Sequence, residues 1–216
     1  YWYTGVLETI SVLRDRFPRS TIILGGIYAS LCTDHARQHA GADETVAGPA
    51  EGAVFEIVAR HTGFETNHRI DPQKLDTYPY PAFDLQNCIN YIPLLTSRGC
   101  PYRCAYCASH FLSPTRMWRS PESVIEEILF WHRRHQVRDF VLYDDAFLVD
   151  AERHALPLLE KIIQADLNLR FHTPNAVHIR GIGPETARLL FEAGFKTLRL
   201  GLETAEFDSR ESIDHK

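Results

Sequence analysis

The sequence predicts an α/β protein built in two parts, each with helices alternating with parallel strands. From residue 92 onward, short apolar runs rich in β-branched and aromatic residues alternate four times with segments of helical spacing. Helix-like and strand-like segments also alternate before residue 65, and the proline-punctuated stretch between the two parts has no periodicity. We therefore expect domains at 1–64 and 92–216, joined by an ordered connector at 65–91.

Composition places the chain among ordinary globular proteins. Its 216 residues are 44% hydrophobic and 24% charged. No apolar run approaches the roughly 20 residues of a membrane span, and the N-terminus lacks the basic start and apolar core of a signal peptide. A formal charge of −5 argues against a nucleic-acid surface. We expect a soluble, cytoplasmic protein with no membrane or nucleic-acid partner.

The five cysteines are an odd number in a chain too large to need disulfide staples, so reduced thiols are expected. Three of them are clustered. Cys32 and Cys88 stand alone, and we predict both to be small buried hydrophobic residues.

In the first part, Gly25-Gly26 follows a β-branched run, at the strand end where parallel sheets bind ligands. Spacing alone favours a plain turn there. Residue 1 falls inside a helix, and the strands are few for a nucleotide-type domain, so we expect the N-terminus of the protein to lie upstream. The expected elements are helices over 6–17, 29–40 and 53–58 and strands over 21–24 and 44–47.

In the second part, regular alternation predicts a parallel barrel or partial barrel, with its chemistry at the carboxyl ends of the strands. Ser120 is the expected N-cap of one helix and Asp150 of another. Pro93 restricts the first strand to an edge, a strand start or a bulge. The expected strands are 91–95, 139–143, 169–173 and 196–200, and the expected helices begin near 121, 155 and 184, with a fourth cut short at Lys216.

Polar or ligating residues follow all four strands. Because the carboxyl ends of parallel strands meet at one edge, we expect these side chains to converge on one rim. They are Cys100, Cys104 and Cys107, then Asp144 and Asp145, then Asn175, then Glu203.

Cys100, Cys104 and Cys107 have the spacing CxxxCxxC on a loop that leaves a strand end. Soft thiolates bind zinc or iron–sulfur clusters in preference to hard-oxygen metals. Three thiolates leave one iron of a four-iron cluster without a protein ligand, and an open position is where a substrate binds. The alternative is a structural zinc site with His110 as the fourth ligand.

With Tyr106 before the last cysteine and Thr-Ser-Arg-Gly before the first, this motif resembles the radical S-adenosylmethionine (SAM) superfamily, in particular members with an upstream cobalamin-binding domain. The resemblance implies a 4Fe-4S cluster on the three cysteines, whose open iron binds the amino and carboxylate groups of SAM. It implies a (β/α)6 partial TIM barrel, of which this chain holds the first four β/α units. A small-molecule substrate and a flavodoxin- or ferredoxin-type electron donor are implied as well.

The resemblance also gives the other rim residues roles in SAM binding. The pair Asp144-Asp145 corresponds to the position that holds the methionine ammonium, and Glu203 to one near the ribose and methionine portions. Asn175 corresponds to a position that faces the site, and the backbone near Tyr106 to the adenine contact. No catalytic residue beyond the cluster ligands is assigned.

The first part resembles the second half of a Rossmann-like cobalamin-binding domain, in Leu-Gly-Gly-Ile-Tyr-Ala-Ser and the segments that follow. There Gly25 and Gly26 correspond to the glycines that line the groove for the nucleotide tail. Two departures stand out. The usual Gly-Glu-x-Glu appears as Gly48-Pro49-Ala50-Glu51, and no Asp-x-His-x-x-Gly motif occurs, so no histidine ligand to cobalt is assigned.

We predict a radical SAM enzyme that generates a 5′-deoxyadenosyl radical, with a cobalamin-dependent methyltransferase as the leading hypothesis. The alternatives are a radical cyclase or rearrangement enzyme with a vestigial cobalamin domain, and a non-catalytic zinc or iron–sulfur binding module. A tRNA methylthiotransferase is disfavoured, because it should bring three more clustered cysteines. Since both domains look incomplete, the chain by itself is expected to bind a cluster without turnover.

Overall fold

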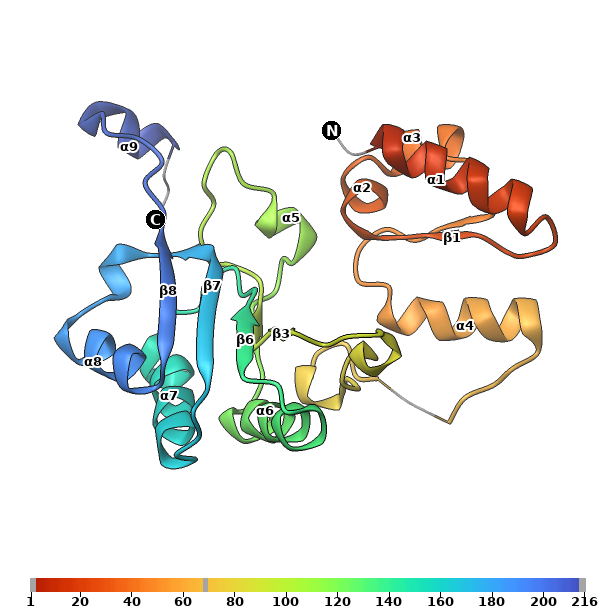
Figure 1. The fold of residues 1–216 in the computed structure, drawn as a ribbon. Helices are drawn as coiled ribbons and strands as arrows, with labels where there is room; N and C mark the ends of the chain where they lie inside the picture. Colours follow the sequence, from red (N-terminus) through yellow and green to blue (C-terminus); the bar gives the residue numbers. More distant parts are fainter. Residues whose placement is uncertain (1–2, 68–69, 214–216) are drawn as a thin grey trace. The chain divides into compact units, whose positions relative to one another are not determined.

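The computed structural model describes residues 3–67 and 70–213 (Figure 1). The chain forms two compact units, Tyr1–Pro72 with Phe111–Ser113 and Gln73–His110 with Pro114–Lys216. The first division, between Pro72 and Gln73, falls inside the segment 65–91 for which a connector was predicted. We describe each unit by itself.

Unit 1 contains a two-stranded parallel sheet with helices between and after its strands. Strands β1 (Ile23–Leu24) and β2 (Glu44–Thr45) are shorter than predicted and place Ile23 opposite Glu44. The single helix predicted over 29–40 is two helices that break at Cys32, and the first begins at Gly26. The helices are α1 (Tyr3–Arg16), α2 (Gly26–Leu31), α3 (Thr33–His39) and α4 (Glu51–Thr62).

Asp43 joins the first helix of this unit to the start of its sheet. Its carboxylate accepts a hydrogen bond from the Ile22 N–H at 2.8 Å and pairs with Arg14 at 2.8 Å. These two donors lower the pKa of Asp43, first the Ile22 N–H and then Arg14. Few apolar residues are fully buried in this unit: Ile10, Ala29, Ala36, Ala40 and Ile57.

Unit 2 is built on a four-stranded parallel sheet, which confirms the predicted α/β class with parallel pairing. Its strands are β3 (Tyr91–Leu94), β6 (Asp139–Leu142), β7 (Arg170–Val177) and β8 (Phe195–Leu200), in the spatial order β3-β6-β7-β8 (Figure 1). Each strand therefore neighbours the next one along the chain. Pro93 is tolerated because β3 lies at an edge of this sheet and pairs with β6 alone. On the side of β3 away from β6, the missing N–H of proline removes no hydrogen bond between strands.

Helices α6 (Pro121–His135), α7 (Ala155–Gln164) and α8 (Pro184–Glu192) connect these strands, and α9 (Phe207–Ile213) follows β8. Ser120 caps α6 as predicted, since its side chain accepts from the Ser123 N–H at 3.2 Å. The core lies between sheet and helices, where Phe140, Phe171 and Phe195 form a stacked row. Other large buried residues include Ile92, Leu94, Ile128, Trp131, Leu158, Leu159 and Leu190.

Several sequence-based expectations were wrong. Strand β7 does not end at Pro174-Asn175 but continues to Val177, with a register shift between Thr173 and Val177. Asp150 makes no side-chain cap, because its carboxylate pairs with Arg116 at 2.7 Å. Cys32 and Cys88 are exposed rather than buried.

The short segments between these elements include a hairpin that the sequence did not predict. Strands β4 (Ser97–Arg98) and β5 (Met117–Trp118) pair antiparallel, and α5 (Ser109–Leu112) lies between them in the chain. Single 3-10 turns occur at Leu75–Thr77, Phe83–Leu85, Ala151–Arg153 and Ile179–Gly181. In the described parts of the chain, no helix is both long and apolar enough to cross a bilayer.

Candidate active site

The three clustered cysteines lie on the loop that the β4–β5 hairpin closes. Ser97 is opposite Trp118, and the Arg119 N–H donates to the Thr96 carbonyl at 2.9 Å, which extends the pairing by one bond. Gly99, directly before Cys100, has a φ of +86°, a conformation that favours glycine. We call the paired strands β4 and β5, together with Thr96 and Arg119, the stem of the cysteine loop. The stem fixes the position of the first residues of the loop, beyond the carboxyl end of β3.

The three cysteines of this loop form no disulfide, and their thiols are partly shielded from solvent. Cys104 is buried, and Cys100 and Cys107 are half-buried. Burial raises the pKa of Cys100, and negative charge on Asp145 and on the other two cysteines raises it further, against the Tyr102 N–H. The loop thus gathers three ionisable thiols and one carboxylate within electrostatic range.

This donor set suits an iron–sulfur cluster. The described residues contain no group of three or more His, Cys, Asp or Glu side chains arranged around a single metal ion. In a four-iron cluster each cysteine binds a different iron, so its three sulfur atoms are held near one another without meeting at one point. Three neighbouring thiols on one loop meet that requirement.

Asp144, one of the predicted SAM ligands, is turned into the protein. Only 3% of its surface is exposed. Its Oδ1 accepts from the Thr96 hydroxyl at 2.7 Å and the Ser97 hydroxyl at 2.6 Å, and the Thr96 N–H donates to both oxygens at 3.2 and 3.3 Å. Burial raises the pKa of Asp144, and these donors oppose that rise. Its carboxylate is occupied by groups of the protein.

Asp145, its neighbour, is exposed and faces the cysteine loop. Its carboxylate accepts a hydrogen bond from the Gly99 N–H, which partly offsets the rise in its pKa caused by desolvation. Its charge also acts on the Cys100 thiol. Of the two predicted aspartates, Asp145 is the one placed beside the cysteines.

The remaining predicted residues have different surroundings. The Asn175 amide donates to the carbonyl of Tyr143 at 2.9 Å and to that of Asp144 at 3.4 Å, so it ties β7 to the end of β6. Glu203 follows β8 and is exposed, and Tyr106 is 51% exposed on the cysteine loop. The Ala105 N–H next to Tyr106 donates to the Ile213 carbonyl at 3.1 Å, which connects this loop to the end of α9.

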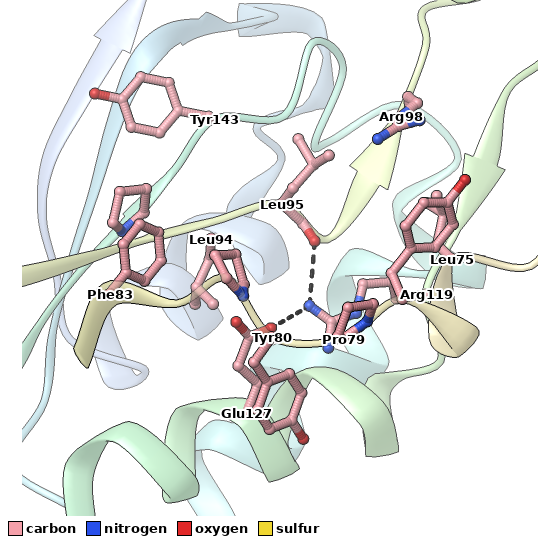
Figure 2. Close-up of a pocket in the computed structure, with 13 residues that line it drawn as sticks. Leu75, Pro79, Tyr80, Phe83, Leu94, Leu95, Arg98, Arg119, Glu127 and Tyr143 are labelled. Carbon is pink, nitrogen blue, oxygen red and sulfur yellow. Dashed lines mark hydrogen bonds and ion pairs between the residues drawn. The ribbon is translucent and has the colours of Figure 1, made fainter. Parts of the chain in front are cut away.

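A cavity of about 310 Å³ lies beside the stem of the cysteine loop, between β3 and the aromatic part of the connector (Figure 2). Its lining is mostly apolar and includes Tyr80, Phe83 and Leu94. Figure 2 shows the Arg119 guanidinium joined to the Leu95 carbonyl and to the buried carboxylate of Glu127. Two of the charged residues that line this cavity, Arg119 and Glu127, are therefore paired with each other.

Unit 1 has its own cavity, of about 890 Å³, next to the glycine pair. Gly25 lines it together with Leu24, Tyr28 and His35, and the Tyr28 hydroxyl is 2.7 Å from Nδ1 of His35. Gly26 has a φ of +84°, which explains a glycine by backbone conformation alone. At Gly25 an added Cβ would make only ordinary contacts, at 3.9 Å.

The sequence analysis used Thr96 and Ser97 only as part of the motif and did not single out His154, yet all three residues organise this site. Thr96 and Ser97 are fully buried at 0% exposure, and Thr96 Oγ1 lies 2.8 Å from Nε2 of His154. Two adjacent hydroxyl residues just before the cysteine motif were a visible signal. No local pattern marked His154, because its partner lies 58 positions away in the chain.

The curated relatives of this chain include two named as methyl-transferring proteins. An uncharacterized methyltransferase of Pyrococcus horikoshii is 30% identical over 142 residues, which cover 62% of this chain and 30% of the relative. The hopanoid C-2 methylase of Rhodopseudomonas palustris is 26% identical over 203 residues, 86% of this chain and 37% of the relative. The chain thus spans about a third of the length of these relatives.

A solved structure shares the fold over the whole chain. The radical SAM methyltransferase TsrM from Kitasatospora setae, solved with cobalamin and a [4Fe-4S] cluster bound, matches with a TM-score of 0.80 at 17% sequence identity. The match covers 100% of this chain and 48% of TsrM. It shows that both parts of the chain have the fold of that enzyme.

The family assignment rests on the sequence of unit 2. The family model described as the radical SAM superfamily matches residues 94–216, which contain the cysteine loop, both aspartates and the strands β6, β7 and β8. Together with a four-stranded parallel sheet whose carboxyl edge carries the three thiols, this match establishes that the chain belongs to the radical SAM superfamily.

Proposed function

We propose that this chain is part of a cobalamin-dependent radical SAM methyltransferase, and that Cys100, Cys104 and Cys107 hold its 4Fe-4S cluster. The observation that carries the proposal is the position of the cysteine loop beside Asp145, at the carboxyl edge of the parallel sheet. That edge is where β/α barrels carry out their chemistry. The fold supports a (β/α)6 partial barrel, of which unit 2 supplies the first four units, preceded by the second half of a Rossmann-like domain.

Cys100, Cys104 and Cys107 would hold the cluster, and when reduced it would supply the electron for cleavage of one carbon–sulfur bond of the SAM sulfonium, to methionine and a 5′-deoxyadenosyl radical. This chain's residues bind and orient the reactants. We assign the SAM ammonium to Asp145, because its carboxylate is exposed and close to Cys100. We retain Glu203 and the backbone near Tyr106 as contacts to SAM, and Asn175 as a residue that supports the rim.

The proposed cobalamin site is the cavity of unit 1 next to Gly25 and Gly26. Its volume of about 890 Å³ and its largely apolar lining suit part of a large cofactor. Gly25 lines this cavity, although an added Cβ would make only ordinary contacts and the backbone conformation does not require glycine there. The two methyl-transferring relatives and TsrM support methyl transfer as the reaction class.

The test uses the full-length protein, reconstituted anaerobically with iron and sulfide. We expect a brown protein with about four irons per chain, which forms 5′-deoxyadenosine from SAM under dithionite and retains cobalamin. Cys104→Ala should lose the cluster and product formation, whereas the matched variant Cys88→Ala should retain both. A full cluster without 5′-deoxyadenosine would overturn the proposal.

The same assay separates the alternatives. A radical cyclase or rearrangement enzyme would form 5′-deoxyadenosine without retaining cobalamin. A zinc-stabilised binding module would be colourless, because zinc has no visible absorption, and Cys104→Ala would then unfold unit 2.

A further inference from the structure

Four buried polar residues meet beneath the cysteine loop. Thr96, Ser97, Asp144 and His154 are 0%, 0%, 3% and 1% exposed, and we call this group the polar clamp. They come from three segments: the stem of the cysteine loop, the end of β6, and the residue before α7. Buried polar groups are costly unless each finds a partner, so the bonds within the clamp are informative.

The hydrogen bonds of the clamp link all four residues. The hydroxyls of Thr96 and Ser97 donate to Oδ1 of Asp144. His154 has two partners: its Nε2 lies 2.8 Å from Thr96 Oγ1, and its ring is also hydrogen-bonded to the backbone of Arg119. The four residues are therefore held by one connected set of bonds.

Packing alone does not explain this group. Well-packed apolar residues of similar size often replace buried charged groups without loss of stability. What apolar residues cannot do is fix the position of one segment relative to another by directed bonds. The clamp binds Thr96 and Ser97, just before Cys100 in the chain, to the residue next to Asp145.

The residues on either side of Asp144 are also hydrogen-bonded to the segment that leads into the cysteine loop. The Gly99 N–H donates to Asp145, and the Tyr143 N–H donates to the Leu94 carbonyl at 2.9 Å. Asn175 holds the carbonyls of Tyr143 and Asp144 from β7. The start of the cysteine loop is thus bonded to the end of β6 on each side of Asp144.

We infer that Asp144 is a positioning residue, which through Thr96, Ser97 and His154 sets the distance between the cysteine thiols and Asp145, and that it does not itself bind SAM. Its oxygens already accept from three donor groups and it is enclosed. This inference rests on the proposed role of the cysteines as cluster ligands. It predicts that breaking the clamp loosens the thiols even in protein without iron.

The test compares Asp144→Asn and Thr96→Val with the control Asp139→Asn. Asp144→Asn places an amide donor against N–H and O–H donors, and Thr96→Val removes the central hydroxyl. Asp139 is the first residue of β6, at the end of the strand away from Asp144, and it pairs with Arg170 and His172. Thr96→Ser keeps the hydroxyl and should restore wild-type behaviour.

Two measurements are made on each folded variant. In the iron-free chain, the alkylation rate of each cysteine is followed by peptide mass spectrometry, with exposed Cys32 and Cys88 as internal references. We expect buried Cys104 to react at least tenfold faster in Asp144→Asn and Thr96→Val, with Cys32 and Cys88 unchanged. In the reconstituted full-length protein, we expect the same variants to lose iron to a chelator at least tenfold faster.

Two results would decide against the inference. One is a Cys104 alkylation rate within twofold of the Asp139→Asn control in both clamp variants. Another is a tenfold loss of SAM affinity in Asp144→Asn with unchanged Cys104 reactivity, which would make Asp144 a ligand. If Asp144→Asn does not fold, Ser97→Ala, which removes one hydrogen bond, is judged by the same criteria.

Failure of the proposed function gives a different pattern. If the iron-free chain shows the expected alkylation rates but the full-length protein binds no iron, the clamp stands and the cluster assignment fails.

Discussion

His154 is a buried residue whose protonation state affects the stability of the fold. Its pKa is lowered to about 4, chiefly by burial and also by the positive charges of Arg116 and Arg119, while the hydrogen bond to the Arg119 backbone and the charge of Asp76 oppose the shift. The ring is therefore neutral at pH 7, with Thr96 and the Arg119 backbone as its hydrogen-bond partners. The unfolded chain, with a pKa near 6.5, takes up this proton first as the pH falls.

The neutral His154 ring therefore contributes up to about 3 kcal/mol to the free energy of unfolding. This contribution is fully present above about pH 6.5 and is lost as the pH falls towards 4. Asp144 acts in the opposite direction, because its pKa is raised. We therefore predict that the stability difference between wild type and His154→Gln narrows by up to about 3 kcal/mol from pH 7 to pH 4. Urea unfolding at each pH measures it, and a constant difference would contradict the prediction.

The pair Asp144-Asp145 shows how neighbouring residues of the same type receive different roles. In β6, Phe140 and Leu142 are buried, whereas Asp139 and Val141 are half-buried. This alternation continues past the strand end, so Asp144 is buried while Tyr143 and Asp145 face outward. The sequence itself is a continuous apolar run from Phe140 to Tyr143, so only the structure distinguished the two aspartates.

At the level of whole elements, the turn Ile179–Gly181 before α8 is packed against the segment that follows β6. A Cβ at Gly181 would lie 2.9 Å from the Leu148 Cβ and 3.2 Å from the Leu148 carbonyl oxygen. Gly183, two residues later, has nothing within 4 Å. The two glycines make a matched pair for testing this contact.

We predict that Gly181→Ala lowers the free energy of unfolding by about 1–3 kcal/mol, because Leu148 is buried and cannot move aside without cost. Gly183→Ala should change it by less than about 1 kcal/mol. Chemical denaturation of both variants tests this, and equal losses would show that the Leu148 contact is not the cause.

For the whole molecule, the proposed cluster site lies within one of the two compact units. A ligand that binds only the folded state stabilises it by mass action. We predict that loading with iron and sulfide slows amide hydrogen exchange in β3, β4 and β6, which carry the cysteine loop and Asp145. Exchange in α4 of unit 1 should change little, and mass spectrometry of both states of the full-length protein resolves the two regions. An equal change in the two units would contradict the prediction.

Much of the architecture was readable from the sequence because it depends on local periodicity. The four strands of unit 2, the Ser120 cap and the placement of the cysteines after the first strand follow from spacing and capping chemistry. The strands of unit 1 were predicted too long, since only two residues of each pair in the sheet. The β4–β5 hairpin was missed, because two-residue strands have no period to detect.

The sequence by itself determined a parallel α/β protein with three thiols beyond a strand end, since apolar periodicity and cysteine spacing are local properties. Only the tertiary structure decided which groups meet beneath those thiols. Thr96 reaches Asp144 across 48 positions and His154 across 58. Contacts of that range form only when the sheet and α7 pack together, because buried hydrogen-bonding groups must then find partners wherever the fold brings them.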